Sequence, residues 1–144
     1  MYKLIFCLLL AVTPVAFTQE NTARPTTKEL MAKDKVFFVT SDTFYVKKEE
    51  LEKGLLNREE FARWGLQVTK NEENADAVLF VRRAPFQTFF PYTITDRATG
   101  IVIMGGEPNS LGGTVPGKIA GDIVEKLRPI YEPKQNAANP AATP

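Results

Sequence analysis

The sequence predicts a single α+β domain, in which a mostly antiparallel sheet carries two or three helices packed on one face. Short runs rich in Val, Phe and Ile are typical of strands. Two other segments place apolar residues at the spacing of a helix face. The order strand, helix, several strands, helix favours a sheet that is covered by helices on one side.

The ends of the chain are predicted to lie outside this domain, which we place at residues 35–128. Residues 1–18 resemble a secretory signal peptide: Lys3 precedes an apolar run, Leu4 to Val12, and Ala16-Phe17-Thr18 has the small-x-small character of a cleavage site. Residues 19–34 are expected to form a flexible lead-in, and the Pro, Ala and Asn-rich residues 129–144 a disordered tail.

Export follows from this interpretation, to the periplasm or the extracellular space. The apolar run is shorter than the roughly 20 residues that span a bilayer, and no later run is long enough, so the mature chain is expected to have no transmembrane span. Phe6 precedes Cys7 where a lipobox would have a small residue, so lipidation is not expected.

The composition excludes several chemistries. Histidine is absent, and Cys7 would leave with the signal peptide, so nucleophile pairs and metal sites that use imidazole or thiolate are excluded. Removing Lys3 from the 18 basic residues leaves 17 against 17 acidic ones. Cations occur at most in pairs, whereas a phosphate-binding surface needs a cluster. We therefore expect no cofactor, no metal and no nucleic-acid partner.

Residues 35–70 predict a strand, two short helices and a second strand. Residues 35–40 form the first strand, which residues 44–46 could resume. Residues 47–57 and 58–64 are the helices, with Leu51 and Leu55 on one face of the first. Gly65 is expected to end the second helix in a left-handed conformation.

Residues 77–106 predict three more strands. Residues 77–83 are apolar on both alternations and are expected to be covered on both faces. Residues 88–96 predict the next strand; Pro91 within it cannot donate a backbone hydrogen bond, so this strand is expected to be an edge strand or to bulge there. We interpret Asp96 to Gly100 as the bend of a hairpin, with Asp96 accepting turn amides and Gly100 taking a positive φ.

The last helix is expected to begin at Thr114, with Pro116 in its first turn, and to end at Arg128. Its apolar stripe consists of Ile119, Ile123 and Leu127. The preceding stretch resembles a phosphate-binding loop, but position 119 is Ile where that loop needs Ser or Thr, so nucleotide binding is not expected.

The candidate partner contacts are Arg82, Arg83, Phe86 and Phe89, because exposed aromatic residues beside arginines are favoured anchors at interfaces. No catalytic residue is predicted. A carboxylate-dependent hydrolase would need two acids in one cleft, and the candidates are Asp42, Asp76, Asp96 and Glu107.

Residues 35–128 resemble small secreted bacterial proteins of uncharacterised function, on the strength of Gly65, Ala75-Asp76 and the Asp96 to Gly100 hairpin. The same order of helices, turns and strands is loosely similar to that of α/β modules in cell-envelope assembly proteins. These modules are the amino-terminal domain type of the Tol system and the curli secretion lipoprotein type. The resemblance implies no catalytic residues, and the lipobox cysteine of the envelope lipoproteins is missing here.

We therefore expect an exported, non-enzymatic domain that binds a protein or a component of the cell envelope. The first alternative is a secreted inhibitor or ligand-binding module of cystatin-like build, with a helix cradled by an antiparallel sheet. The second is the carboxylate-dependent hydrolase.

Overall fold

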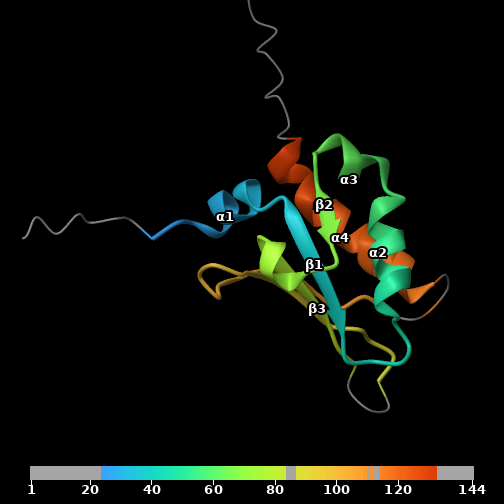
Figure 1. Cartoon of the computed structure of the whole chain (residues 1–144). Coiled ribbons are helices and arrows are strands. Elements are labelled where there is room, and N and C mark those ends of the chain that lie inside the picture. The colour runs from blue at the N-terminus through green and yellow to red at the C-terminus, as the bar shows by residue number, and fades with distance from the viewer. Residues whose placement is uncertain (1–23, 84–86, 110, 112–113, 133–144) are drawn as a thin grey trace, which may run out of the picture.

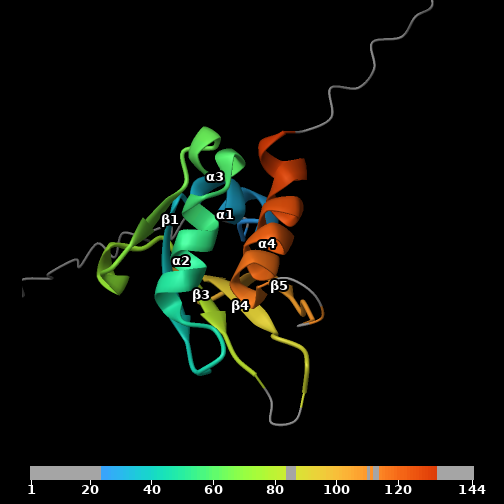
Figure 2. The same ribbon diagram turned by 90° about the vertical axis from the view of Figure 1, so that its right-hand side faces the viewer.

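The computed structural model describes residues 24–83, 87–109, 111 and 114–132. The predicted signal peptide and residues 133–144 of the predicted tail lie outside the described residues. Within these, the predicted single α+β domain is confirmed: helices pack against a five-stranded sheet (Figures 1 and 2).

The sheet is mixed. Its strands are β1 (Val36–Ser41), β2 (Gln67–Thr69), β3 (Ala77–Val81), β4 (Tyr92–Asp96) and β5 (Val102–Gly106), in the order β2-β1-β3-β4-β5. β1 is parallel to both β2 and β3, whereas β3, β4 and β5 pair antiparallel. The expected antiparallel character holds only for this second half, because helices between β1 and β2 return the chain to its starting end, and a parallel pairing needs such a crossover.

The helices are α1 (Thr27–Lys33), α2 (Lys48–Leu56), α3 (Glu59–Arg63), the 3-10 turn η1 (Glu72–Asn74) and α4 (Val115–Tyr131). α2 and α4 lie side by side over one face of the sheet (Figures 1 and 2). The contact is close at Gly54, where a Cβ would lie 3.3 Å from the Pro116 carbonyl oxygen. The predicted stripe of α4 is confirmed, since Ile119, Ile123 and Leu127 are at most 1% exposed.

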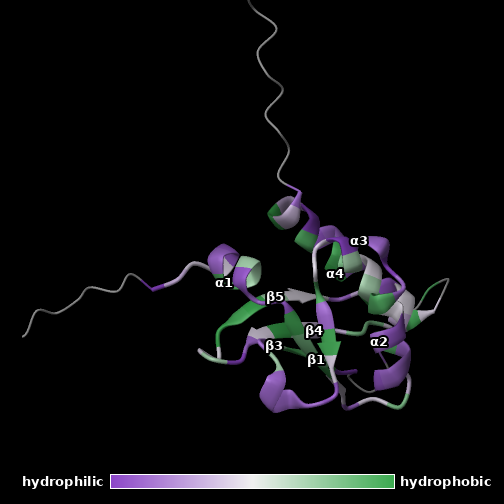
Figure 3. Cartoon of the chain, turned by 45° about the horizontal axis from the view of Figure 1, so that its top comes forward, coloured by the Kyte–Doolittle hydropathy of each residue, from purple (hydrophilic) through white to green (hydrophobic). Residues whose placement is uncertain are grey.

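The core lies between these helices and the sheet. Figure 3 shows strands β1 and β3 coloured mostly as hydrophobic, while α2 is mostly hydrophilic. In β3 the residues that face the helices, Ala77, Leu79 and Val81, are fully buried, but Val78 and Phe80 on the other face are only partly buried. β3 is therefore covered fully on one face, and the expectation of cover on both was wrong.

The irregularity in the antiparallel half lies away from Pro91. β4 is an interior strand, and Pro91 precedes it. The register shifts between Ile94, which pairs with Met104, and Thr95, which pairs with Val102, so Ile103 is an extra residue in β5. This bulge buries both Ile103 and Met104, and it corrects the expectation of an edge or bulged strand at Pro91.

The turn chemistry matches its prediction. The Asp96 carboxylate accepts a hydrogen bond from the Thr99 amide at 2.6 Å and one from the Thr99 hydroxyl. Gly100 has a φ of 69° and Gly65 a φ of 70°, both in the left-handed region. Residues 96–100 are thus the bend of the β4–β5 hairpin.

Both predicted boundaries of the domain were too narrow. Part of the expected lead-in forms α1, which begins with a capping box between Thr26 and Glu29 and buries Leu30 and Met31. α4 continues through Pro129 to Tyr131, which stacks on Trp64 at 5.3 Å and donates a hydrogen bond to the Met31 carbonyl at 2.7 Å. Long-range contacts thus order both segments, and Pro129 is tolerated on the exposed side of the helix.

Within the described ranges, no helix has both the length and the apolar character needed to cross a bilayer.

If α1 belongs to the domain, Leu30→Ala should lower the free energy of unfolding by about 2–4 kcal/mol, because Leu30 is 4% exposed and truncation leaves a cavity. Lys28→Ala, on the exposed face of the same helix, should change it by less than about 0.5 kcal/mol. Urea unfolding followed by the fluorescence of Trp64 measures both variants. Equal unfolding midpoints for the two would contradict the docking of α1.

Candidate functional site

Three connections meet at one end of the sheet, where the parallel strands β1 and β3 both finish. We call this region the loop end; it comprises the described parts of residues 42–47, 82–91 and 107–114 (lower part of Figure 2). The Asp42 amide donates to the Val81 carbonyl at 3.1 Å, and the Phe90 amide donates to the Pro108 carbonyl at 2.9 Å. Backbone hydrogen bonds therefore tie the first connection to the end of β3 and the second connection to the third.

Exposed apolar side chains gather at the loop end. Six large apolar side chains are exposed among the described residues, and four of them lie here: Phe44, Tyr45, Phe89 and Leu111. Phe44 is 101% exposed and Leu111 75%, so neither contributes to the core. Scattered single apolar residues are ordinary on a protein surface, whereas a group of them at one end makes that end a candidate contact surface.

Arg83 organises the aromatic residues of this end. Its guanidinium lies 3.9 Å from the centre of the Tyr45 ring and 5.4 Å from that of Phe90, and its Nε donates to the Gln87 carbonyl at 2.8 Å. Tyr45 and Phe90 also meet edge to face at 6.5 Å. Arg83 thus fixes Tyr45 by a cation–π contact and ties the β1–α2 connection to the β3–β4 connection.

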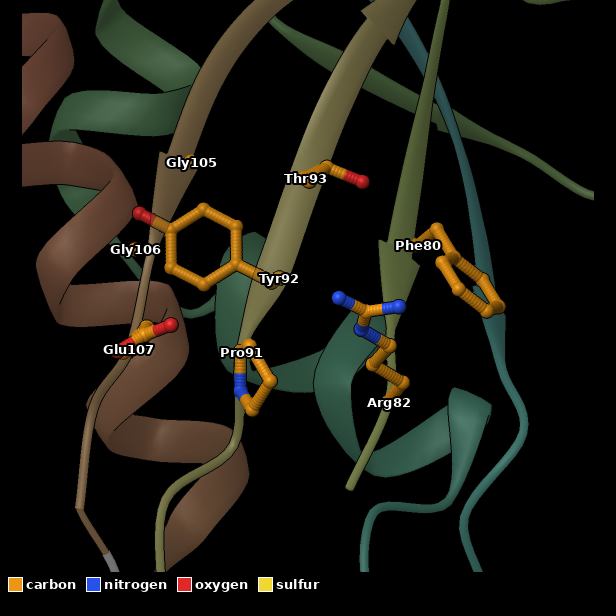
Figure 4. Close-up of a pocket in the computed structure, with 8 residues that line it drawn as sticks. All are labelled: Phe80, Arg82, Pro91, Tyr92, Thr93, Gly105, Gly106 and Glu107. Carbon is orange, nitrogen blue, oxygen red and sulfur yellow. The ribbon is translucent and has the colours of Figure 1, made fainter. Parts of the chain in front are cut away.

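Arg82 points to the other side of the sheet, because adjacent residues of an extended chain alternate. It lines a hollow of about 510 Å³ on the face of β3, β4 and β5 (Figure 4). Pro91 lies between Arg82 and Glu107, so that one cation and one anion flank an apolar ring. Gly105 leaves the floor without a side chain, and Phe80 and Thr93 complete the same face.

A second hollow adjoins the first at Pro91 and Glu107 and runs toward Gln87, Thr88 and Phe89. Phe89 is 48% exposed, and its backbone pairs with Asn109 in an isolated bridge. The two hollows together form a shallow groove from the open sheet face to the loop end.

The structure divides the predicted contact residues. Arg82 and Phe89 line the groove, and Arg83 lies among the aromatic rings, while Phe86 lies outside the described residues. Sequence reasoning missed Phe44, Tyr45 and Leu111, and it named Glu107 only as a possible hydrolase acid. Phe44 and Tyr45 lie in the stretch that could resume the first strand, but the polar Ser41-Asp42-Thr43 break before them is the signal of a loop.

The groove offers little for acid–base catalysis. Glu107 is the one carboxylate lining these two hollows, so the pair of acids that glycoside hydrolysis uses is missing from them. Tyr92 donates its hydroxyl proton to the Asp122 carboxylate at 2.5 Å, and burial, reinforced by that carboxylate, raises the pKa of Tyr92 far above its usual value. Tyr92 is therefore a fixed donor and not a base at neutral pH.

None of the other predicted acids lines the groove, although Asp42 lies at the loop end. Asp76 accepts hydrogen bonds from the Lys35 and Val36 amides at 3.0 Å each, and Asp96 holds its turn, both at the end of the sheet opposite the loop end. Within the described part of the chain, no group of acidic side chains has an arrangement that could hold a metal ion.

No protein family and no curated protein matches this chain by sequence. Among solved structures, a variant of the PelC dodecamer from Paraburkholderia phytofirmans matches with 16% identity and a TM-score of 0.33, covering 71% of this chain and 88% of that chain. A second PelC dodecamer structure matches with 15% identity and the same TM-score of 0.33, covering 67% and 86%. Agreement at this level leaves the function to be argued from the residues of the chain itself.

The two neighbouring arginines should respond differently to truncation. Arg83→Ala should lower the free energy of unfolding by about 0.5–1 kcal/mol, because the cation–π contact with Tyr45 is lost. Arg82→Ala is the matched control and should leave stability unchanged, because Arg82 is exposed. Urea unfolding gives the stability, and the NMR ring signals of Tyr45 should sharpen only for Arg83→Ala. An equal loss of stability in both variants would contradict the different roles assigned to Arg82 and Arg83.

Proposed function

We propose that the chain is an exported, non-enzymatic domain that binds a protein partner of the cell envelope through its loop end. The observation that carries the proposal is the exposure of Phe44, Tyr45, Phe89 and Leu111 at the loop end, where Arg83 stacks on Tyr45. Aromatic residues and arginine are the side chains that contribute most to protein interfaces.

The charge distribution supports a protein over a nucleic acid as the partner. The loop end mixes the cations Lys47, Arg82 and Arg83 with the anions Asp42 and Glu107, so it has no strong positive field. A mixed polar border around apolar anchors is typical of a protein interface. The groove would then hold a segment of the partner that presents an apolar group between opposite charges.

An inhibitor of another protein is a second candidate, and one observation favours it. A secreted inhibitor needs apolar loops exposed at one end of its sheet, and the loop end provides them. The mixed sheet, however, departs from the fully antiparallel cradle of a cystatin-like build. The two candidates differ in consequence, since an inhibitor abolishes its partner's activity at saturation and a structural partner does not.

The second alternative named from the sequence, a carboxylate-dependent hydrolase, has little support. Each of the three hollows described on the surface is lined by a single carboxylate, either Glu107 or Glu50. One oxygen of Asp76 accepts from two backbone amides, and one oxygen of Asp96 accepts from the Thr99 amide and hydroxyl, so both carboxylates already have structural roles.

A photo-crosslinking amino acid tests the proposed surface. Placed at position 44 in the full chain, it should give a covalent adduct with an envelope protein, whereas at position 56 it should give none. Leu56 is the matched control, because it is exposed to 57% on α2, away from the loop end. Identical adducts at both positions, or none at position 44, would contradict the proposal.

The affinity for the protein captured in this way provides the quantitative test. Phe44→Ala combined with Phe89→Ala should weaken binding at least tenfold, because large aromatic side chains contribute most to such contacts. Leu56→Ala combined with Val102→Ala removes a similar exposed apolar area elsewhere and should change the affinity less than twofold. Mass spectrometry of the mature amino terminus tests export separately.

A further inference from the structure

Three carboxylates meet at the end of the sheet opposite the loop end. Asp34 caps α1 just before β1, Asp76 precedes β3, and Asp96 ends β4. The strand register places them in one corner, because Phe37 pairs with Ala77 and Ala77 pairs with Asp96. We call this group the carboxylate corner.

Two of the three carboxylates have donors and the third lacks one. Asp76 accepts from two backbone amides, and Asp96 accepts from the Thr99 amide and hydroxyl. Asp34 is 1% exposed, and its Oδ2 has no hydrogen-bond partner among the described residues. A buried carboxylate oxygen without a donor is costly to ionise.

The surrounding charges act in the same direction. Burial first, then the negative charges of Asp96 and Asp76, raise the pKa of Asp34 to about 6, and Lys33 opposes them only in part. The Thr99 hydroxyl and, against the effect of burial, the Thr99 amide lower the pKa of Asp96, with smaller contributions from Lys33 and Asp34. A protonated Asp34 can donate a hydrogen bond to Asp96.

The other polar groups of this corner are engaged elsewhere. From α4, the Tyr131 hydroxyl lies 3.4 Å from the Asp34 backbone carbonyl and donates to Met31 at 2.7 Å. The Lys35 ammonium lies 4.0 Å from the centre of the Tyr131 ring, and Arg97 Nε donates to the Ala75 carbonyl at 2.7 Å. Neither cation forms an ion pair with the Asp34 carboxylate.

We propose that α1 is a pH-sensitive latch: a proton shared between Asp34 and Asp96 holds α1 on the domain, and its loss toward neutral pH loosens α1. When Asp34 ionises, two buried negative charges, those of Asp34 and Asp96, lie in one corner, and the exposed Asp76 adds a third at its edge. Separating them is favourable, and the joint between α1 and β1 is where they can separate.

α1 is the element that can detach from the domain at the lowest cost in free energy. α1 has only seven residues. Each strand, in contrast, is hydrogen-bonded to one or two other strands of the sheet. α1 packs on β5 and α4 through Leu30 and Met31. Local opening of such a terminal element costs less free energy than global unfolding. Its release would uncover β5 at Ile103 and Met104, which are buried in the latched form.

The direction of the pH effect follows from linkage. A carboxyl group whose pKa is higher in the latched form binds its proton more tightly there, so the latch weakens as pH rises from about 4 to 6 and changes little above that. Asp96 acts at lower pH. Because its pKa is lowered, its ionised carboxylate stabilises the fold at neutral pH, and this stabilisation is lost in acid. The two groups can therefore be separated by pH.

Hydrogen exchange of the full chain tests the latch. The opening equilibrium constant of the α1 amides, corrected for intrinsic exchange, should increase about tenfold between pH 5 and pH 7.5. Amides of β3 should show no such increase. The fluorescence of Trp64, which stacks on Tyr131, should follow the same titration. An opening constant for α1 that is the same at both pH values would overturn the proposal.

Asp34→Asn separates the latch from other pH effects. An amide can donate to Asp96 as the protonated carboxyl does, but it cannot ionise, so α1 should stay closed at both pH values. Asp42→Asn, at the exposed loop end, is the matched control and should keep the tenfold change. If Asp34→Asn keeps the change, the proposal is wrong. If Asp34→Asn fails to fold, the titration of the unchanged chain decides by itself.

Discussion

The structure depends on the packing of two helices against one face of a single sheet. The predicted mature chain has no cysteine, so no disulfide can supplement this layer. α4 supplies a continuous apolar stripe, and α2 approaches it closely only because Gly54 has no side chain facing Pro116 and Ala120. With the core on one side, the opposite face and both ends of the sheet are free to carry polar and functional groups. The groove and the carboxylate corner both occupy these regions.

The parallel pairing of β1 with β3 determines which groups share an end. Because both strands run the same way, the connections that follow them meet at the loop end, and the residues that precede them, Asp34 and Asp76, meet at the other. β3 has five residues, so the two ends are separated by about 17 Å. α1 contacts none of the three connections of the loop end through the hydrogen bonds described. The latch and the proposed partner surface are thus independent in position, and loosening α1 leaves the aromatic cluster in place.

Local signals in the sequence predicted the parts of the fold that depend on neighbouring residues. The positive φ of Gly65 and Gly100, the Asp96 turn and the α4 stripe each follow from residues within one or two turns. The parts that failed depend on distant partners. α1 is ordered by Tyr131, which is 100 residues from Met31, and the capping box alone is too short a signal. Whether β1 and β2 pair in parallel depends on the end of the sheet to which α2 and α3 bring the chain, and no local sequence pattern specifies this.

The site was predictable to the same degree. The sequence identifies a segment rich in Arg and Phe, but it does not show that Arg82 and Arg83 face opposite sides of the sheet or that Tyr45 comes from another connection. Phe44 provides the strongest argument for binding. A side chain that is 101% exposed buries no area on folding, so the hydrophobic effect gives it no role in stability. The same holds in large part for Leu111. The fold does not need several such residues at one end, and this is the ground for the proposed contact with a partner.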